Sequence, residues 1–270
     1  MADASEIIEH VKDSDVFHLP FGQHWDIPQP FEGIGLHLTK FMLLELVVAV
    51  LMIAIFVPIA RCVATGQRPR GRLWNMFEAL LVFIRDQVAR PAIGSHDADR
   101  FMPFLWNIFF FILFLNLIGL VPWGGSPTGA LGVTGALALI TFITVVGAGI
   151  AKFGPVKFWI GQVPHMEVPF VMGIFLKPMM FVIEVFGLCV KHFVLAVRLF
   201  ANMFAGHLVL SVVTGFIAAT APMLAWYGVM PTSVLGAVAL SLLEILVAFI
   251  QAYVFTFLAA LFIGMAVHQH

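Results

Sequence analysis

Long apolar runs dominate the pattern of this sequence. The first, 41–60, is interrupted only by Glu45 near its start and Pro58 near its end. It matches the roughly 20 residues that are needed to cross about 30 Å of hydrocarbon. Two further runs of similar length, 101–120 and 131–150, are separated by the charge-free turn VPWGGSPTGA. Each of the three runs predicts one transmembrane helix.

Two longer apolar segments, about 179–220 and 232–265, follow and are divided by the turn ATAPMLAWYGVMP. As straight helices they would measure roughly 63 and 51 Å, well beyond a bilayer about 30 Å thick. Each must therefore be broken, or both must lie strongly tilted. The stretch before them, 161–178, contains three prolines, which predicts an interfacial or re-entrant segment rather than a span.

Segment 73–90 has a different pattern, because apolar residues recur at helical spacing with polar residues on the other faces. We expect an amphipathic surface helix there that stops at Pro91. Four arginines lie just before and at its start, Arg61, Arg68, Arg70 and Arg72, without an acid among them. The positive-inside rule places this region in the cytoplasm and the N-terminus outside. With five passes, the C-terminus is expected to be cytoplasmic.

Composition agrees with a membrane protein, since 61% of the residues are hydrophobic and only 11% are charged. Soluble domains carry roughly 25% charged residues. A soluble enzyme, a disordered segment and a nucleic-acid binder with a basic face are therefore excluded. The two cysteines, Cys62 and Cys189, have no metal-ligand spacing and are interpreted as buried thiols, so no metal or cofactor is expected.

The predicted fold class is thus an all-α integral membrane protein. It comprises about five passes, one cytoplasmic amphipathic helix, and two long, strongly tilted C-terminal helices. We expect residues 1–40 to form an extracytoplasmic segment and residues 41–270 a single membrane domain.

Ionisable and polar residues inside the two long segments are the candidates for function. They are Glu184, Lys191, Arg198, Asn202, His207, Glu244 and Gln251. A charged side chain at the centre of a membrane helix costs about 2.5 to 3.5 kcal/mol on insertion scales. Such residues usually pair, line water or carry out a function.

The spacing of these residues is informative. Glu184, Lys191 and Arg198 are each seven apart and form one stripe, with Asn202 one turn further on. His207 lies about 180° round the helix from Arg198. Glu244 and Gln251 share a face of the last segment.

Two interpretations of these residues remain open from the pattern alone. Polar groups often only hold membrane helices together, at roughly 0.6 to 2 kcal/mol each, which would explain Glu184, Lys191 and Asn202 equally well. Arg198 lacks an obvious mate on its own helix, which suggests a carboxylate on another subunit. His207 alone would be a structural histidine, but together with Glu244 it forms a plausible proton relay.

The string VRLFANMFAGH, residues 197–207, resembles the signature of subunit a of F-type rotary ATP synthases, the stationary proton-channel subunit beside the rotating c-ring. LEILVAFIQAYVFTFL, 243–258, resembles the last membrane helix of that family, and NMFEALLVFIRDQVARP, 75–91, resembles its amphipathic connection. The resemblance covers most of residues 40–267.

This resemblance implies that Arg198 is the essential arginine facing the ring carboxylate, with Gln251 and Asn202 as polar residues near it. Glu184 and Lys191 match polar positions on the same helix. His207 and Glu244 occupy places where many bacterial members have Glu and His respectively, so the pair is exchanged. Together these residues would serve proton translocation through two aqueous half-channels.

The resemblance also implies a non-catalytic subunit in the bacterial inner (plasma) membrane. Its expected partners are the c-ring, peripheral-stalk b-type subunits, other ATP synthase subunits, membrane lipid and protons, and no nucleic acid. Two other classes of membrane protein each predict a feature that this sequence lacks. A secondary ion transporter would show inverted repeats, and none is visible. A haem anchor needs histidines on facing helices, whereas His192 and His207 lie on one.

Overall fold

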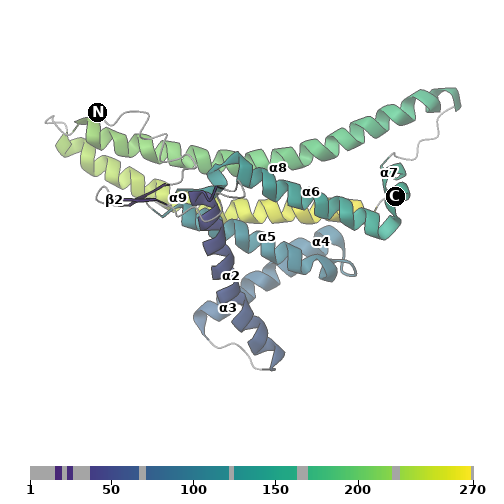
Figure 1. Ribbon diagram of the computed structural model, residues 1–270, viewed down its shortest axis with the longest axis horizontal. Coiled ribbons are helices and arrows are strands. Elements are labelled where there is room, and N and C mark those ends of the chain that lie inside the picture. Colours follow the sequence, from purple (N-terminus) through teal and green to yellow (C-terminus); the bar gives the residue numbers. More distant parts are fainter. Residues whose placement is uncertain are drawn as a thin grey trace.

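A computed structural model describes residues 16–19, 23–26, 37–66, 71–121, 125–162, 170–220 and 226–268 (Figure 1). In chain order the elements are β1 (Val16–Leu19), β2 (Gln23–Asp26), α2 (Lys40–Ala64), α3 (Arg72–Phe83), the π-helical η2 (Ile84–Ala89), α4 (Arg90–Ile93), α5 (Ala98–Gly119), the 3₁₀ turn η3 (Pro127–Gly129), α6 (Leu131–Phe153), α7 (Pro155–Ile160), α8 (Phe170–Thr220) and α9 (Trp226–Val267).

Five of these helices are long and apolar enough to cross a membrane, namely α2, α5, α6, α8 and α9. The five-pass prediction is thereby confirmed. The first three begin and end within a few residues of the predicted runs. Thr39 caps α2, since its hydroxyl accepts from the Met42 N–H.

Both long C-terminal helices are unbroken, which leaves strong tilt as the remaining one of the two predicted possibilities. Helix α8 holds 51 residues and passes through Pro178, and α9 holds 42 residues and passes through Pro231. The segment predicted to be interfacial or re-entrant, 161–178, is α-helical over 170–178 as the start of α8, so Pro178 does not interrupt the chain there, while 163–169 lie outside the described residues. Membrane helices tolerate proline because neighbouring helices and local adjustments satisfy the freed backbone groups.

Figure 1 shows α8 and α9 running along the long axis of the molecule, with α2 directed across it. At 1.5 Å per residue the two helices extend over roughly 76 and 63 Å. Helices of that length cannot stand upright in about 30 Å of hydrocarbon. Strong tilt in the membrane stays a prediction that this geometry favours.

The amphipathic segment is helical, as predicted, but Pro91 does not end it. The chain continues as α3, η2 and α4 to Ile93, and Gly94 follows with φ +93°. Pro91 lies in the first turn of α4, where a backbone N–H is not required. Wide turns in η2 interrupt the α-helical hydrogen bonding just before it.

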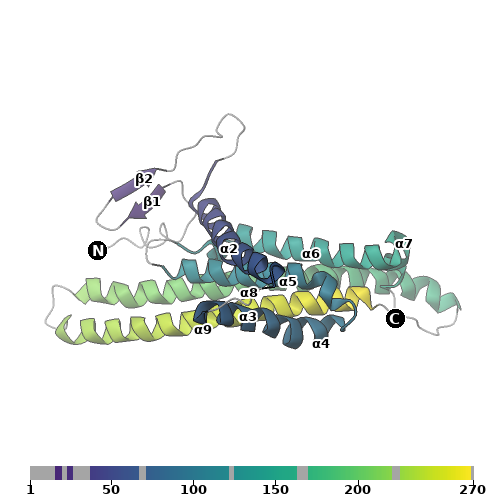
Figure 2. The same cartoon turned by 90° about the horizontal axis from the view of Figure 1, so that it is seen from below.

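An antiparallel hairpin of β1 and β2, with Val16 opposite Asp26, was not predicted. Figure 2 shows it apart from the helical body, on the N-terminal side of α2. It contributes nothing to the five spans.

The core lies where the C-terminal part of α9 is enclosed by other helices. Phe255, Ala259 and Ile263 of α9 are fully buried, as are Leu105 and Phe109 of α5. Near the end of α9, Gly264 lies so close to the Ala92 carbonyl that a side chain would collide with it. The connection after η2 is therefore fixed against α9.

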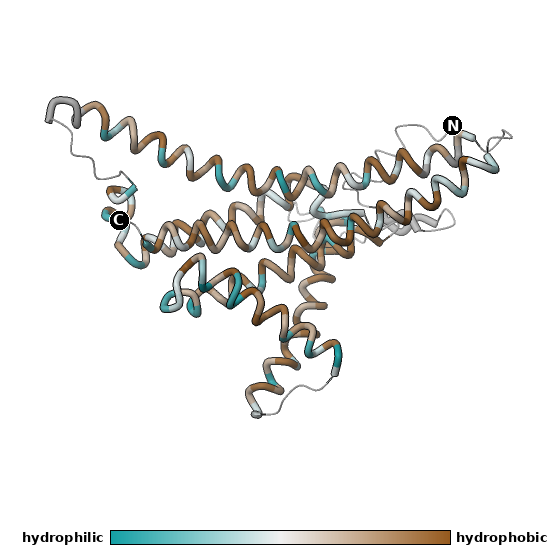
Figure 3. Tube along the Cα trace, turned by 180° about the vertical axis from the view of Figure 1, so that it is seen from behind, coloured by the Kyte–Doolittle hydropathy of each residue, from teal (hydrophilic) through white to brown (hydrophobic). Residues whose placement is uncertain are grey.

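Much of α8 and of the first half of α9 is not covered by protein. Figure 3 shows apolar positions along α2 and both long helices, and hydrophilic positions gathered at the connection from α4 to α5. The prediction that both cysteines are buried thiols is wrong. Cys189 is exposed on α8 and Cys62 is partly exposed near the end of α2, because apolar surroundings here mean lipid as well as protein.

Candidate functional site

The hairpin of α8 and α9 brings together candidate residues about 50 positions apart in sequence. Asn202 Nδ2 donates to Gln251 Oε1 at 2.6 Å. Gln251 is 3% exposed, and its Nε2 has no hydrogen-bond partner among the described residues. An amide pair inside an apolar hairpin fixes the relative position of the two helices.

Glu244 lies two turns before Gln251 on α9 and reaches α8 one turn after Asn202. Its side chain lies over Gly206, where an added Cβ would overlap Oε1 and lie 3.2 Å from the carboxyl carbon. The site is therefore open to a carboxylate only because residue 206 has no side chain. His207 is the next residue along α8.

His207 is also tied to α5. Its Nε2 lies 2.9 Å from the Gly119 carbonyl oxygen at the end of α5, and its Nδ1 lies 2.9 Å from the Met203 carbonyl oxygen. A neutral imidazole has one N–H and can donate to only one of these oxygens. A ring with both nitrogens facing acceptors is suited to receiving and passing on a proton.

A polar cluster beside His207 was missed by the sequence analysis. Thr128 Oγ1 donates to Asn116 Oδ1 at 2.8 Å and lies 3.1 Å from Ser126 Oγ. Asn116 Nδ2 donates in turn to the Ala248 carbonyl oxygen of α9, one turn from Glu244. All three side chains are buried. The one sequence feature that could have indicated this cluster is Asn116, a polar residue inside the apolar run 101–120.

Glu184 and Lys191 form a second group. The Lys191 Nζ lies 3.9 Å from Glu184 Oε1, as their shared stripe predicts. Both line a cavity of about 470 Å³ together with Gln162, against Phe158 and Phe262. Two charges and an amide make this a polar opening in an otherwise apolar wall.

Arg198 lies along α8 between the group around His207 and the group around Lys191. It contacts neither group. It is exposed, and it makes no ion pair or hydrogen bond within the part of the chain that is described. His207 points instead toward α5, which agrees with the predicted half-turn between the two residues. The guanidinium stays protonated at any accessible pH, so it offers a permanent positive charge on an uncovered helix face.

No group of three metal-ligating side chains occurs among the described residues. The site residues are carboxyls, an imidazole, amides and fixed charges. Such groups can bind and transfer protons.

Comparison with known proteins supports this chemistry. The sequence model of the ATP synthase A chain family matches residues 42–264. A protein named ATP synthase subunit a from Myxococcus xanthus is 41% identical over 249 residues, which cover 91% of this chain and 79% of that protein.

Proteins of the same name from Chloroherpeton thalassium and Anaeromyxobacter dehalogenans are 40% and 36% identical. These matches cover 97% and 98% of this chain, and 76% and 70% of the two relatives. The transporter alternative is not favoured. The chain belongs to the ATP synthase A chain family and is a non-catalytic, multi-pass, proton-translocating subunit of a bacterial ATP synthase.

Proposed function

We propose that Arg198 faces the ionisable carboxyl groups of a rotating c-ring and keeps two proton paths apart. The observation that carries this is the unpaired guanidinium on the uncovered face of α8. A permanent charge in an apolar setting needs a counter-charge. No counter-charge contacts Arg198 within the described residues. A carboxylate on a partner subunit would supply it.

The outer path runs past Glu244 and His207. The cluster of Asn116, Ser126 and Thr128 lies beside it and supplies hydroxyl and amide groups that can hold water. A proton from outside would pass from this group to a ring carboxyl. The neutral acid can then enter lipid, because removal of the charge removes most of the transfer cost.

The inner path runs through the cavity at Glu184, Lys191 and Gln162. Along α8, Glu184 lies about 21 Å from Arg198 on one side and His207 about 14 Å on the other, at 1.5 Å per residue. Arg198 thus stands between the two polar groups. It favours the ionised carboxylate, so a ring carboxyl releases its proton to the inner path as it approaches.

The proposed orientation has residues 1–40 outside, 41–270 as one membrane domain and the C-terminus in the cytoplasm. The arginines that follow α2 support it. The assembly would include the c-ring and peripheral-stalk b-type subunits in the bacterial inner membrane. The membrane potential supplies about 2.3 kcal/mol per charge per 100 mV.

Arg198→Ala tests the proposal. The complex should assemble, since an alanine is easily accommodated in a membrane helix, but proton-driven ATP synthesis in vesicles should fall to background. Passive proton leak should rise. Arg72→Ala is the matched control, because Arg72 is also exposed but lies outside the spans. Substantial ATP synthesis by an assembled Arg198→Ala complex would overturn the proposed role.

A further inference from the structure

Asn107 is a polar side chain near the middle of the span α5. It lies about 14 Å along the helix from the start of α5 and about 18 Å from its end. Its side chain is exposed and makes no hydrogen bond within the described residues. The neighbouring polar groups of α5 are satisfied, since Trp106 donates to the Leu81 carbonyl oxygen and Asn116 bonds to two partners. Asn107 therefore differs from both.

The Asn107 side chain lines a cavity of about 400 Å³ between α2, α5 and α6. Ile53 of α2, Phe111 of α5 and Ile140 of α6 line it as well, and every lining residue except Asn107 is apolar. Ile53 and Ile140 are 62% and 51% exposed, so the cavity is an open groove rather than a closed pocket. No lining residue belongs to α8 or α9, which separates the groove from the proposed proton paths.

Lipid cannot satisfy the amide of Asn107. The hydrocarbon layer is about 30 Å thick, so the polar head groups lie roughly 15 Å from a side chain at its middle. Acyl chains have no hydrogen-bonding group. Polar side chains inside a span usually bond across helices or face the interior of a bundle. The uncovered amide therefore indicates a helix contact that the described part of this chain does not supply.

The wall formed by α6 suits the close approach of another helix. Ala136, Thr144 and Gly147 lie within about 40° of Ile140 round α6, at about 100° per residue. Ala136 and Gly147 are exposed, and an added Cβ at Gly147 would meet nothing within 4 Å. Small residues allow the backbones of membrane helices to approach closely. The Thr144 hydroxyl is already bonded to the Ile140 carbonyl oxygen at 2.8 Å, which leaves Asn107 as the polar group in need of a partner.

We propose that one transmembrane helix of another subunit lies in this groove and bonds to Asn107 through a hydroxyl or amide side chain at the middle of the membrane. A single helix fits, because α2 borders the groove on one side and α6 on the other. The inference requires only that the chain is one subunit of an ATP synthase complex. Its failure would leave the proposed role of Arg198 intact.

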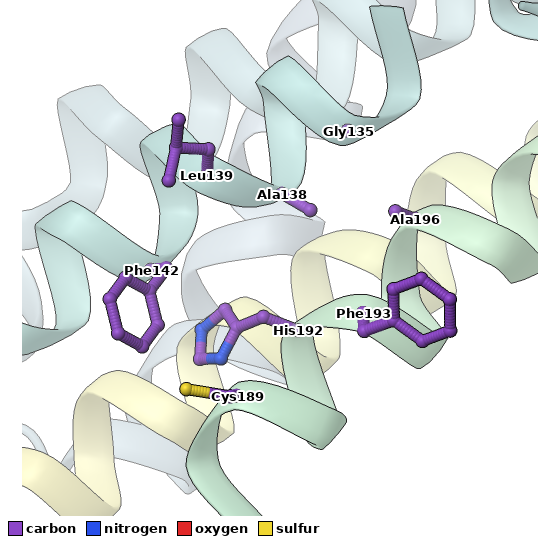
Figure 4. A pocket seen from close by; sticks show the side chains of 8 residues that line it. All are labelled: Gly135, Ala138, Leu139, Phe142, Cys189, His192, Phe193 and Ala196. Carbon is purple, nitrogen blue, oxygen red and sulfur yellow. The ribbon is translucent and has the colours of Figure 1, made fainter. Parts of the chain in front are cut away.

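Photo-cross-linking in the purified, intact complex tests the proposal. A p-benzoylphenylalanine in place of Ile53 or of Ile140 should cross-link to the same apolar segment of another subunit, as mapped by mass spectrometry. That segment should carry a hydroxyl or amide side chain within about one turn of the cross-linked residue. The matched controls are Leu51, about 160° round α2 from Ile53, and Leu139, which lines a separate cavity beside His192 (Figure 4). Neither control position should reach the segment.

Substitutions then test the hydrogen bond itself. Asn107→Leu should speed the loss of the cross-linked subunit from the detergent-solubilised complex roughly three- to twentyfold, and Asn107→Gln, which keeps an amide, should restore most of the retention. Thr144→Val should change nothing, because that hydroxyl bonds within α6. Ile140→Trp should weaken retention by filling the groove, whereas Leu139→Trp should not.

Four results would overturn the proposal. They are cross-links from positions 53 and 140 to lipid alone, cross-links to a second copy of this chain, a contacted segment without a hydroxyl or amide, and unchanged retention in Asn107→Leu.

Discussion

The carboxyl group of Glu244 lies directly over the Cα of Gly206, so that α9 touches α8 through an acid at the residue next to His207. The contact exists because residue 206 has no Cβ. Antiparallel packing of the hairpin places both residues at this level, with Gly206 one turn from Asn202 on α8 and Glu244 two turns from Gln251 on α9. A glycine here therefore determines where an ionisable group stands.

Gly206→Ala should displace that carboxyl. The new methyl group would overlap Glu244 Oε1, and either the side chain or the helix must move. Overpacking of this kind costs about 1 to 3 kcal/mol. Because a misplacement of about 1 Å can cost a hundredfold in rate, ATP-driven proton pumping in vesicles should fall roughly ten- to a hundredfold.

Two controls separate this effect from a general loss of stability. Gly215→Ala lies on the same helix, where an added Cβ meets nothing within 4 Å, and it should pump normally. Glu244→Asp shortens the acid by one methylene group, so the double variant with Gly206→Ala should recover part of the activity. Normal pumping by Gly206→Ala alone would show that the carboxyl position is unimportant.

Periodicity and run length were sufficient to predict the helices of this protein but not their continuity. The first three spans and the amphipathic segment follow from apolar spacing, which directly reflects lipid and surface exposure. The unbroken path through Pro178 and Pro231 could not be predicted from local rules, because tertiary neighbours decide whether a proline ends a helix. Nothing in the apolar pattern indicated the β1–β2 hairpin.

The hydrogen bond between Asn202 and Gln251 predicts a measurable coupling between the two helices. In a cycle of Asn202→Ala, Gln251→Ala and the double variant, thermal unfolding in nanodiscs should give a coupling energy of about 0.6 kcal/mol, and at most about 1.7 kcal/mol. Asn202→Ala combined with Thr256→Ala is the control pair. The Thr256 hydroxyl bonds within α9 to the Ala252 carbonyl oxygen, so these two changes should be additive. Additivity in both cycles would contradict a stabilising amide pair.

Membrane orientation can be tested with two matched exposed valines. Val121 follows α5 and is 55% exposed, and Val156 is on α7 and is 67% exposed. In a chain without its native cysteines, Val121→Cys should react with a charged maleimide added outside sealed vesicles of native orientation. Val156→Cys should react only after the vesicles are opened. Labelling of both from one side would rule out the five-pass orientation with the N-terminus outside.

Single residues of the site were predictable where the helix period relates them, and pairs between helices were not. The seven-residue spacing predicted that Glu184 and Lys191 share a helix face, and the two side chains are in contact. The bonds from Asn202 to Gln251 and from His207 to Gly119 depend on hairpin register and on where α5 ends, which no local pattern encodes. For the same reason the sequence did not reveal the cluster of Asn116, Ser126 and Thr128, which forms because η3 packs on α5 and α5 packs on α9.

Asp97 joins three elements outside the membrane-spanning segments. It lies just before α5 and accepts from Lys152 Nζ of α6 at 2.6 Å. His268, after α9, lies 3.8 Å from it and also contacts the Ile93 carbonyl oxygen, while His96 lies 3.7 Å away. The hydrogen bond and charge of Lys152, and secondarily those of His96, lower the pKa of the Asp97 carboxyl, although partial burial opposes this.

The sign of the pH dependence follows from that direction. A carboxyl with a lowered pKa in the folded state stabilises the fold at every pH above its unfolded value of about 3.9, and the contribution is lost as pH falls further. Asp97→Asn should therefore lower the melting temperature of the complex in nanodiscs above about pH 5, and this difference should begin to shrink near pH 4 and vanish only below the lowered pKa of Asp97. Lys152→Met should remove the main cause of the lowered pKa, so the loss on acidification should be smaller and should be complete at a higher pH. A difference between Asp97→Asn and the unmodified protein that grows as the pH falls below 4 would have the wrong sign and would exclude this ion pair as the connection between α5 and α6.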